Sequence, residues 1–229
     1  MRLDKYLRDC GYGTRSEIRK AVRSGHITLN GSIVRNPAEI LDPGTDTVEV
    51  DGQSLKYTEY VYFMLNKPAG YITANKGNVP TVMDLVPEPY LNLFPVGRLD
   101  KDTEGLLLIT NDGPLGHRLL SPRYHAEKEY YVEVDRMPSA EQLEEIRKGG
   151  LRFAEETFAP AEVRDVQDCH CRIILTEGKY HEVKRIFLAL GCKVTYLKRI
   201  RMKDLILDET LEPGTYRRLT EDEISGLYA

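Results

Sequence analysis

The sequence predicts an α+β protein with two domains: a small N-terminal unit of two helices and a β-hairpin, and a larger unit built mainly from strands. Apolar residues recur at helical spacing near the N-terminus, an Asn-Gly pair at positions 30–31 is typical of a hairpin turn, and short apolar or alternating runs recur after residue 60. The 229 residues are enough for one medium domain and one small one. We predict domains at residues 1–57 and 60–229.

The first domain is predicted to begin with two helices. Residues 3–10 have the apolar spacing of one helix. Thr14 and Glu17 have the spacing of a capping box for a second helix, which ends at Gly25. The elements that follow are a hairpin over 26–34, a strand over 47–50 and a polar connector over 53–59.

The second helix carries a row of basic side chains. Residues four apart lie on one face of a helix, so three arginines form a basic ridge: Arg15, Arg19 and Arg23. Residues 1–36 have a net charge of +5 although the whole chain has −4, and residues 178–203 contain eight basic groups and one acid. Two basic patches on an acidic body fit a polyanion bound at defined places, although a basic helix face is also an ordinary solvated surface.

The second domain is predicted to combine strands and helices. The expected strands lie at 60–68, at Tyr71-Ile72, at 106–109, at 127–134, within 151–177 and at 194–199. The expected helices begin near Pro114, Ser139 and Val183.

A charged loop precedes the apolar run at 106–109. It contains Arg98, Asp100, Asp102 and Glu104. A loop fixed to the end of a buried strand is a good place for a reactive carboxylate, because the strand holds it still. The spacing alone fits a solvated acidic loop equally well.

The composition limits which cellular compartment and which cofactors we expect for this protein. The chain has no apolar run long enough to span a bilayer and no apolar signal-peptide core at its start, so we expect a cytoplasmic protein without membrane contact. Four cysteines in a chain of this size suggest reduced thiols. Cys169 and Cys171 would share one face of a strand with His170 on the other, so we expect no metal site.

Two stretches of the second domain resemble a known family. Residues 97–113, with Gly97-Arg98-Leu99-Asp100 followed by Thr103, Gly105 and Thr110-Asn111-Asp112-Gly113, resemble the signature of the pseudouridine synthases, and more narrowly of the RsuA type, which isomerises single uridines in ribosomal RNA. The resemblance implies a mixed, mainly antiparallel catalytic sheet flanked by helices, with Asp100 as the catalytic residue.

The second stretch, residues 177–187, implies further site residues. By resemblance, Lys184 pairs with the catalytic Asp, Tyr130 packs against the target base, Leu197 lies near the base pocket and Lys67 lies beside the active site. Glu182 departs from the usual Gln of the family. We assign substrate binding to Lys67, Leu197, Arg185 and the basic ridge, and to Arg98, whose planar guanidinium can occupy the stack that a flipped base vacates.

The order of elements in the first domain resembles the S4 RNA-binding domain. The expected function is therefore isomerisation of a uridine in ribosomal RNA, acting on the RNA or on a ribosome-assembly intermediate as a monomer. Both substrate and product are uncharged at the base, so no metal or redox cofactor is expected.

Several alternatives stay open. Residues 1–5, 62–68 and 121–128 are most similar to the small-subunit (16S) enzymes, but large-subunit (23S) relatives share most of the pattern. A non-catalytic S4-containing RNA-binding or assembly protein is a further possibility, as is a hydrolase that pairs Asp100 with Asp102 or Glu104.

Overall fold

The computed structural model describes residues 1–90 and 92–229. The chain divides into two compact units. The first comprises Met1–Val61 and Pro87–Leu93, and the second comprises Tyr62–Val86 and Phe94–Ala229. Pro87–Leu93 belongs with the first unit although it lies inside the range 60–229, which the sequence analysis treated as a single domain.

The first unit contains two helices and a small antiparallel sheet of order β2-β1-β3-β4. Its elements are α1 (Leu3–Asp9), α2 (Arg15–Ser24), β1 (Ile27–Leu29), β2 (Ser32–Ile33), β3 (Val48–Val50) and β4 (Gln53–Ser54). The predicted capping box is present, since the Glu17 amide donates to Thr14 Oγ1 at 3.3 Å and the Thr14 amide donates to Glu17 Oε2 at 2.7 Å. The apolar faces of both helices pack with β1 and β3 in one core.

Both tight turns of this unit have positive φ at their two central residues. Asn30 and Gly31 join β1 to β2 with φ of 50° and 76°, as the sequence predicts. Asp51 and Gly52 join β3 to β4 with φ of 49° and 80°. The chain thus continues into a strand at 53–54, where we expected only a polar connector.

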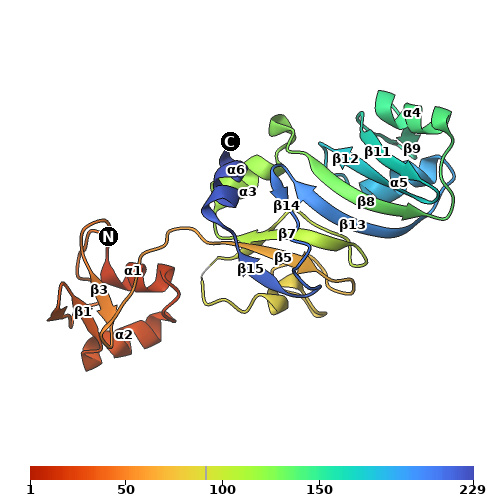
Figure 1. Cartoon of the computed structure of the whole chain (residues 1–229). Helices are drawn as coiled ribbons and strands as arrows, with labels where there is room; N and C mark the ends of the chain where they lie inside the picture. Colours follow the sequence, from red (N-terminus) through yellow and green to blue (C-terminus); the bar gives the residue numbers. More distant parts are fainter. Residues whose placement is uncertain (91) are drawn as a thin grey trace. The chain divides into compact units, whose positions relative to one another are not determined.

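The second unit is built on one large sheet, of order β11-β12-β8-β13-β7-β5-β15, with β14 beside β13 and β6 beside β7 (Figure 1). Its strands are β5 (Tyr62–Lys67), β6 (Phe94–Val96), β7 (Glu104–Thr110), β8 (Lys128–Val134), β11 (Glu162–Gln167), β12 (His170–Leu175), β13 (Val194–Met202), β14 (Leu205–Ile206) and β15 (Tyr216–Arg218), with a separate pair β9 (Arg152–Phe153) and β10 (Glu156–Thr157). The pairing is antiparallel except between β13 and β7, which are parallel. The predicted mixed, mainly antiparallel α+β fold is confirmed.

The helices cover this sheet in two places. They are α3 (Gly113–Leu120), α4 (Ala140–Lys148), α5 (Glu182–Ala189) and α6 (Glu221–Tyr228), with 3-10 turns η1 (Val82–Leu85) and η2 (Pro122–Tyr124). The helices α4 and α5 pack against β8, β11, β12 and β13 over a shared apolar core. At the other end of the sheet, β5 is buried throughout and β7 almost throughout, so these strands read as continuous apolar runs.

Two details differ from the sequence-based expectations. Tyr71-Ile72 forms no return strand, because Ile72 makes only an isolated parallel bridge to Thr81. The helix α6 was not predicted, and its Tyr228 hydroxyl bonds to the buried Asp112, which also accepts from Tyr62 at 2.8 Å.

Gly105 allows β7 to approach β13 closely. Its φ is +98°, and a Cβ there would lie 2.3 Å from the Arg199 carbonyl oxygen. Only glycine fits this contact, in backbone angle and in space. The contact joins the end of the charged loop to the middle of β13, and this junction positions the site described next.

Candidate active site

A cavity of about 580 Å³ opens in the second unit beside the junction of β7 and β13. Its walls come from the loop before β7, from β8 and β13, and from the segment that leads into α5. Four of the predicted site residues line it: Arg98, Asp100, Tyr130 and Leu197. Residues distant in the sequence therefore meet at a single hollow.

The Asp100 carboxylate is held by two side chains of the segment that begins α5. Lys184 Nζ lies 3.0 Å from Asp100 Oδ2, and His181 Nε2 lies 3.4 Å from Oδ1. Lys184 also contacts Asp102 Oδ1 at 2.5 Å. The Asp100 side chain is 23% exposed, so it is accessible from the cavity while it is fixed in position.

The charges of this cluster are strongly coupled. Burial acts to lower the pKa of Lys184, but hydrogen bonds to Asp102 and Asp100 outweigh burial and raise it. Burial likewise acts to raise the pKa of Asp102, and Lys184 outweighs it, so this pKa is lowered. Lys184 is therefore a fixed cation at neutral pH, placed against both carboxylates of the loop.

Backbone contacts hold the loop that carries Asp100. Thr73 Oγ1 donates to the Leu99 carbonyl at 2.8 Å and accepts from the Leu99 amide at 3.1 Å. Lys67 Nζ donates to the carbonyl of Thr103 at 2.7 Å and to that of Pro68 at 3.0 Å. The loop is thus clamped on both sides of Asp100.

Lys67 occupies a different position from the substrate-binding one that we predicted. Its side chain is 0% exposed and does not line the cavity. Burial lowers the pKa of Lys67 to about 8, against the opposing charges of Asp102, Glu104 and Asp100. The ammonium supports the loop from beneath and is not available to an RNA.

Tyr130, Leu197 and Arg98 present three different surfaces to the cavity. Tyr130, on β8, is half-buried, and burial raises the pKa of its hydroxyl although the neighbouring Arg199 opposes the rise. Leu197, on β13, is buried, and Arg98 is exposed. The cavity thus offers an aromatic ring, an apolar wall and a planar cation, which together suit a flat, uncharged base.

Comparison with known proteins identifies this arrangement. Residues 61–189 match the model of the RNA pseudouridylate synthase family, and residues 1–46 match that of the S4 domain. The chain belongs to the RNA pseudouridine synthase family. Both resemblances that the sequence suggested are confirmed.

Individual relatives of this pseudouridine synthase match over nearly the whole chain. An uncharacterized RNA pseudouridine synthase of Bacillus subtilis is 41% identical, with 98% of this chain and 97% of the relative covered. A ribosomal small subunit pseudouridine synthase A of Vibrio parahaemolyticus is 40% identical over the full length of both chains, and one of Escherichia coli is 39% identical over 99% and 100%. A crystal structure of a pseudouridylate synthase matches with a TM-score of 0.69 at 38% identity, covering 99% of both chains.

Arg185 lies outside the cavity of the synthase, unlike the substrate contact that we predicted. Its Nη1 donates to Glu156 Oε2 at 2.7 Å, and its guanidinium lies over the rings of Phe153 and Phe158. These contacts fasten α5 to the β9–β10 hairpin. Lys184, one position earlier, therefore faces Asp100 while Arg185 is part of the packing.

The carboxylate pairs required by a hydrolase do not form in the described part of the cavity. Asp102 is 74% exposed and contacts Lys184, and Glu104 Oε2 accepts from the Tyr196 hydroxyl at 2.7 Å. Neither residue lines the cavity beside Asp100. The geometry gives no support to a glycosidase-like pair.

Sequence reasoning missed several groups around the cavity. His181, Lys128 and Arg199 line it, and Arg199 is 1% exposed. Glu182 is also buried there, and burial raises its pKa to about 7, with the neighbouring Glu177 adding to the rise. His181 and Glu182 lie within the recognised stretch 177–187, whereas the positions of Lys128 and Arg199 follow from strand pairing and carry no local signal.

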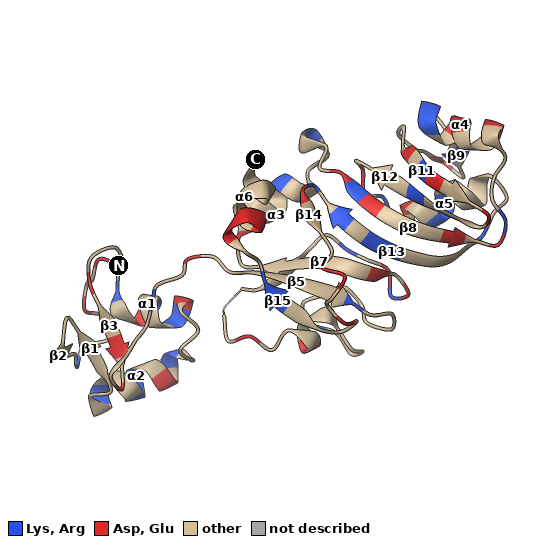
Figure 2. Ribbon diagram, in the orientation of Figure 1, with Lys and Arg blue, Asp and Glu red and all other residues tan. Residues whose placement is uncertain are grey.

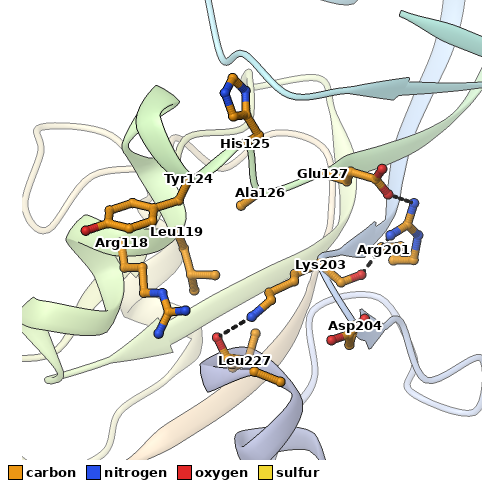
Figure 3. Close-up of a pocket in the computed structure, with 11 residues that line it drawn as sticks. Arg118, Leu119, Tyr124, His125, Ala126, Glu127, Arg201, Lys203, Asp204 and Leu227 are labelled. Carbon is orange, nitrogen blue, oxygen red and sulfur yellow. Dashed lines mark hydrogen bonds and ion pairs between the residues drawn. The ribbon is translucent and has the colours of Figure 1, made fainter.

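A second cavity, of about 370 Å³, lies where α3, the start of β8 and α6 meet (Figure 3). Three of the charged side chains that line it are hydrogen-bonded within the lining. Lys203 Nζ donates to the Leu227 carbonyl at 3.1 Å, and Arg201 bonds to Glu127 at 2.8 Å. Such mutual pairing is typical of structural contacts between elements, so we place the active site at the larger cavity.

The basic ridge lies on α2 of the S4 unit (Figure 2). Arg15, Arg19 and Arg23 are exposed, whereas Ile18, Ala21 and Val22 of the same helix are buried. The predicted ridge therefore faces solvent, as an RNA-binding surface requires.

Residues 1–90 and 92–229 contain neither a candidate membrane span nor a cluster of metal-ligating side chains. No helix there is both long and apolar enough to cross a bilayer. Nor do three or more His, Cys, Asp or Glu side chains converge there as metal ligands would.

Proposed function

We propose that this pseudouridine synthase isomerises one uridine of small-subunit (16S) ribosomal RNA to pseudouridine, with Asp100 as the catalytic carboxylate. The observation that supports this role is the Asp100–Lys184 pair at the cavity, beside Tyr130 and Leu197. The choice of ribosomal RNA and of the small subunit rests on the names of relatives about 40% identical over the full chain.

The proposed reaction moves one glycosidic bond. The N1–C1′ bond breaks, the uracil turns, and a C5–C1′ bond forms, while the C5 proton is lost and N1 gains a proton. Atoms and charge balance without an oxidant or a reductant. Asp100 either attacks C1′ or removes a 2′ proton, and Lys184 places a positive charge beside its carboxylate and orients it.

The remaining lining residues are assigned to handling of the base. A stacked uridine is unreachable, so it must leave the stack at a cost of a few kcal/mol. Tyr130 then stacks on the flipped uracil and Leu197 forms the opposite wall. Arg98, exposed at the cavity, fills the gap in the RNA stack.

Release of tritium from RNA containing 5-³H-uridine tests the reaction, and nucleoside analysis of the product tests its identity. We expect tritium release together with pseudouridine. Asp100→Asn keeps the shape of the side chain and removes its charge, so turnover should be abolished while RNA affinity changes little. Asp168→Asn, at an exposed turn, is the matched control. Turnover of Asp100→Asn within tenfold of wild type contradicts the assignment, and free uracil among the products indicates a hydrolase.

Mapping of pseudouridines in ribosomal RNA from a deletion strain tests the target. One 16S position should lose its modification and regain it when the wild-type gene is restored. Loss of a 23S position instead assigns the enzyme to the large subunit, and an unchanged map favours a non-catalytic assembly role. We further propose that the enzyme acts as a cytoplasmic monomer on RNA or on an assembly intermediate, which light scattering and binding to both substrates would test.

A further inference from the structure

Arg199 is a buried cation at the cavity whose hydrogen bonding is incomplete. It lies in the middle of β13 and is 1% exposed. Its Nε donates to the Leu106 carbonyl on β7 at 2.8 Å. Its Nη2 is buried and has no hydrogen-bond partner in the described residues.

A buried guanidinium with an unmet donor is costly, because that donor has lost its water without replacement. A buried donor of this kind requires an explanation, and a functional role in the cavity is one that can be tested. Arg199 lines the same cavity as Asp100 and Tyr130, and the Tyr130 hydroxyl lies close enough to interact with its charge. Arg199 therefore belongs to the wall of the cavity in which the base is expected to bind.

The surroundings of Arg199 fix it in place. The Gly105 contact holds the Arg199 backbone against β7, and Arg199 Nη1 lies beside Gly97, 3.6 Å from where a Cβ would be. Lys128, another cation of the cavity, donates to the Ala126 carbonyl at 2.8 Å and is thereby already bonded. Arg199 is thus held in place by its backbone and by Nε, while the N–H groups of Nη2 have no partner among the described residues.

We propose that the Arg199 guanidinium donates a hydrogen bond to a carbonyl oxygen of the flipped uracil. This inference rests on the proposed function, because it requires a base in the cavity. Uracil carries carbonyl oxygens at C2 and C4, and both are neutral acceptors that suit a fixed charged donor. The bond would hold the detached base in the cavity while it turns.

Sulfur substitution at the target uridine tests the contact. Sulfur accepts hydrogen bonds weakly, so 2-thiouridine or 4-thiouridine at the contacted position should lower the wild-type kcat/KM by about ten- to hundredfold, as expected for loss of a bond to a charged donor. The Arg199→Met variant should already show that loss of kcat/KM on the oxygen substrate. Sulfur substitution should then lower its kcat/KM little further. Arg199→Lys, which keeps the charge, should be intermediate.

The comparison separates substrate binding from a structural role. If Arg199 only supports the sheet or Tyr130, the variants should lose the same factor in kcat/KM on the oxygen and on the sulfur substrates. The proposal is overturned if sulfur at each of the two positions lowers kcat/KM by the same factor in the wild type and in the variants. Circular dichroism melting checks folding, and Arg199→Lys keeps the test usable if Arg199→Met does not fold. Wild-type enzyme that forms no pseudouridine from the oxygen substrate contradicts the proposed function itself, which is a separate outcome.

Discussion

Lys184 Nζ lies 3.0 Å from Asp100 Oδ2 and thereby joins the first turn of α5 to the loop before β7. The two residues are 84 positions apart in the sequence. Hydrogen bonds to Asp102 and Asp100 outweigh burial and raise the pKa of Lys184, so the cation persists across the working range of pH. The pair places a fixed charge beside the proposed catalytic carboxylate.

Lys184→Met removes this cation and should disfavour the ionised form of the carboxylate cluster. We expect the acid side of the pH–rate profile to move up by about one pH unit or more, with a severe loss of turnover at neutral pH. Lys184→Arg should keep the wild-type profile because the charge survives. Single-turnover rates against pH at saturating enzyme measure both. If the Lys184→Met variant keeps the acid side of the wild-type pH–rate profile, another group orients Asp100.

Loss of the basic ridge should weaken RNA binding in a salt-dependent way. Each phosphate contact removed by Arg15, Arg19 and Arg23→Ala should reduce the slope of log K against log salt by roughly 0.7–0.9. Filter binding or fluorescence anisotropy over a salt series gives the slope. The matched control replaces three exposed basic residues of the catalytic unit (Lys148, Arg164 and Lys193) by Ala, which changes the net charge equally. Equal slopes in the two triple variants would mean that the ridge is only a solvated surface.

Lys67 should make folding stability rise in alkaline solution. Burial lowers its pKa to about 8, from an ordinary value of 10.5, so between these values the unfolded chain holds more protons than the folded one. The unfolding free energy should therefore increase by about 3 kcal/mol from pH 8 to 10.5. The Lys67→Met variant should not show this increase. The substitution also removes the donor to the Thr103 and Pro68 carbonyls of the loop, so turnover should fall too. Urea unfolding at three pH values measures the effect, with exposed Lys76→Met as control. Parallel pH curves for wild type and Lys67→Met would contradict the prediction.

Glu182 should have the opposite effect at lower pH. Burial raises its pKa to about 7 from an ordinary 4.5, so the folded state holds more protons between these values and stability falls as pH rises. Glu182→Gln mimics the protonated acid and should be more stable than wild type at pH 8 by about 1–3 kcal/mol, with little difference at pH 4.5. Denaturant unfolding at both pH values, with Glu145→Gln on the surface of α4 as control, checks this. An equal gain at both pH values would indicate a packing effect unrelated to titration.

The sequence predicted the features that local chemistry determines. The capping box at Thr14 and the turn at Asn30-Gly31 involve residues a few positions apart, and both are present. The helix α6 and the strand β4 carry equivalent signals, at Thr220 with Glu223 and at Asp51-Gly52, and attention to them would have found both elements.

Other features depend on pairing between distant strands. The positions of Lys67 beneath the loop and of Arg199 beside Tyr130 follow from the register of β5, β7, β8 and β13. The local sequence around a basic residue in a strand does not show whether its side chain is a buried donor or a surface contact. For this reason Arg185 and Lys67 were both placed with the substrate, although each contacts protein partners outside the cavity.

The contact of Gly105 with Arg199 fixes the backbone beneath the cavity but not the side chains at its edge. Because backbone meets backbone there, the spacing between the reactive loop and β13 is a property of the sheet. Arg98 and Tyr180, which border the cavity, are exposed and take no part in this backbone contact, although the Tyr180 ring stacks on that of His181. We therefore expect substitutions at these rim positions to change how RNA is bound without changing the backbone frame that carries Asp100.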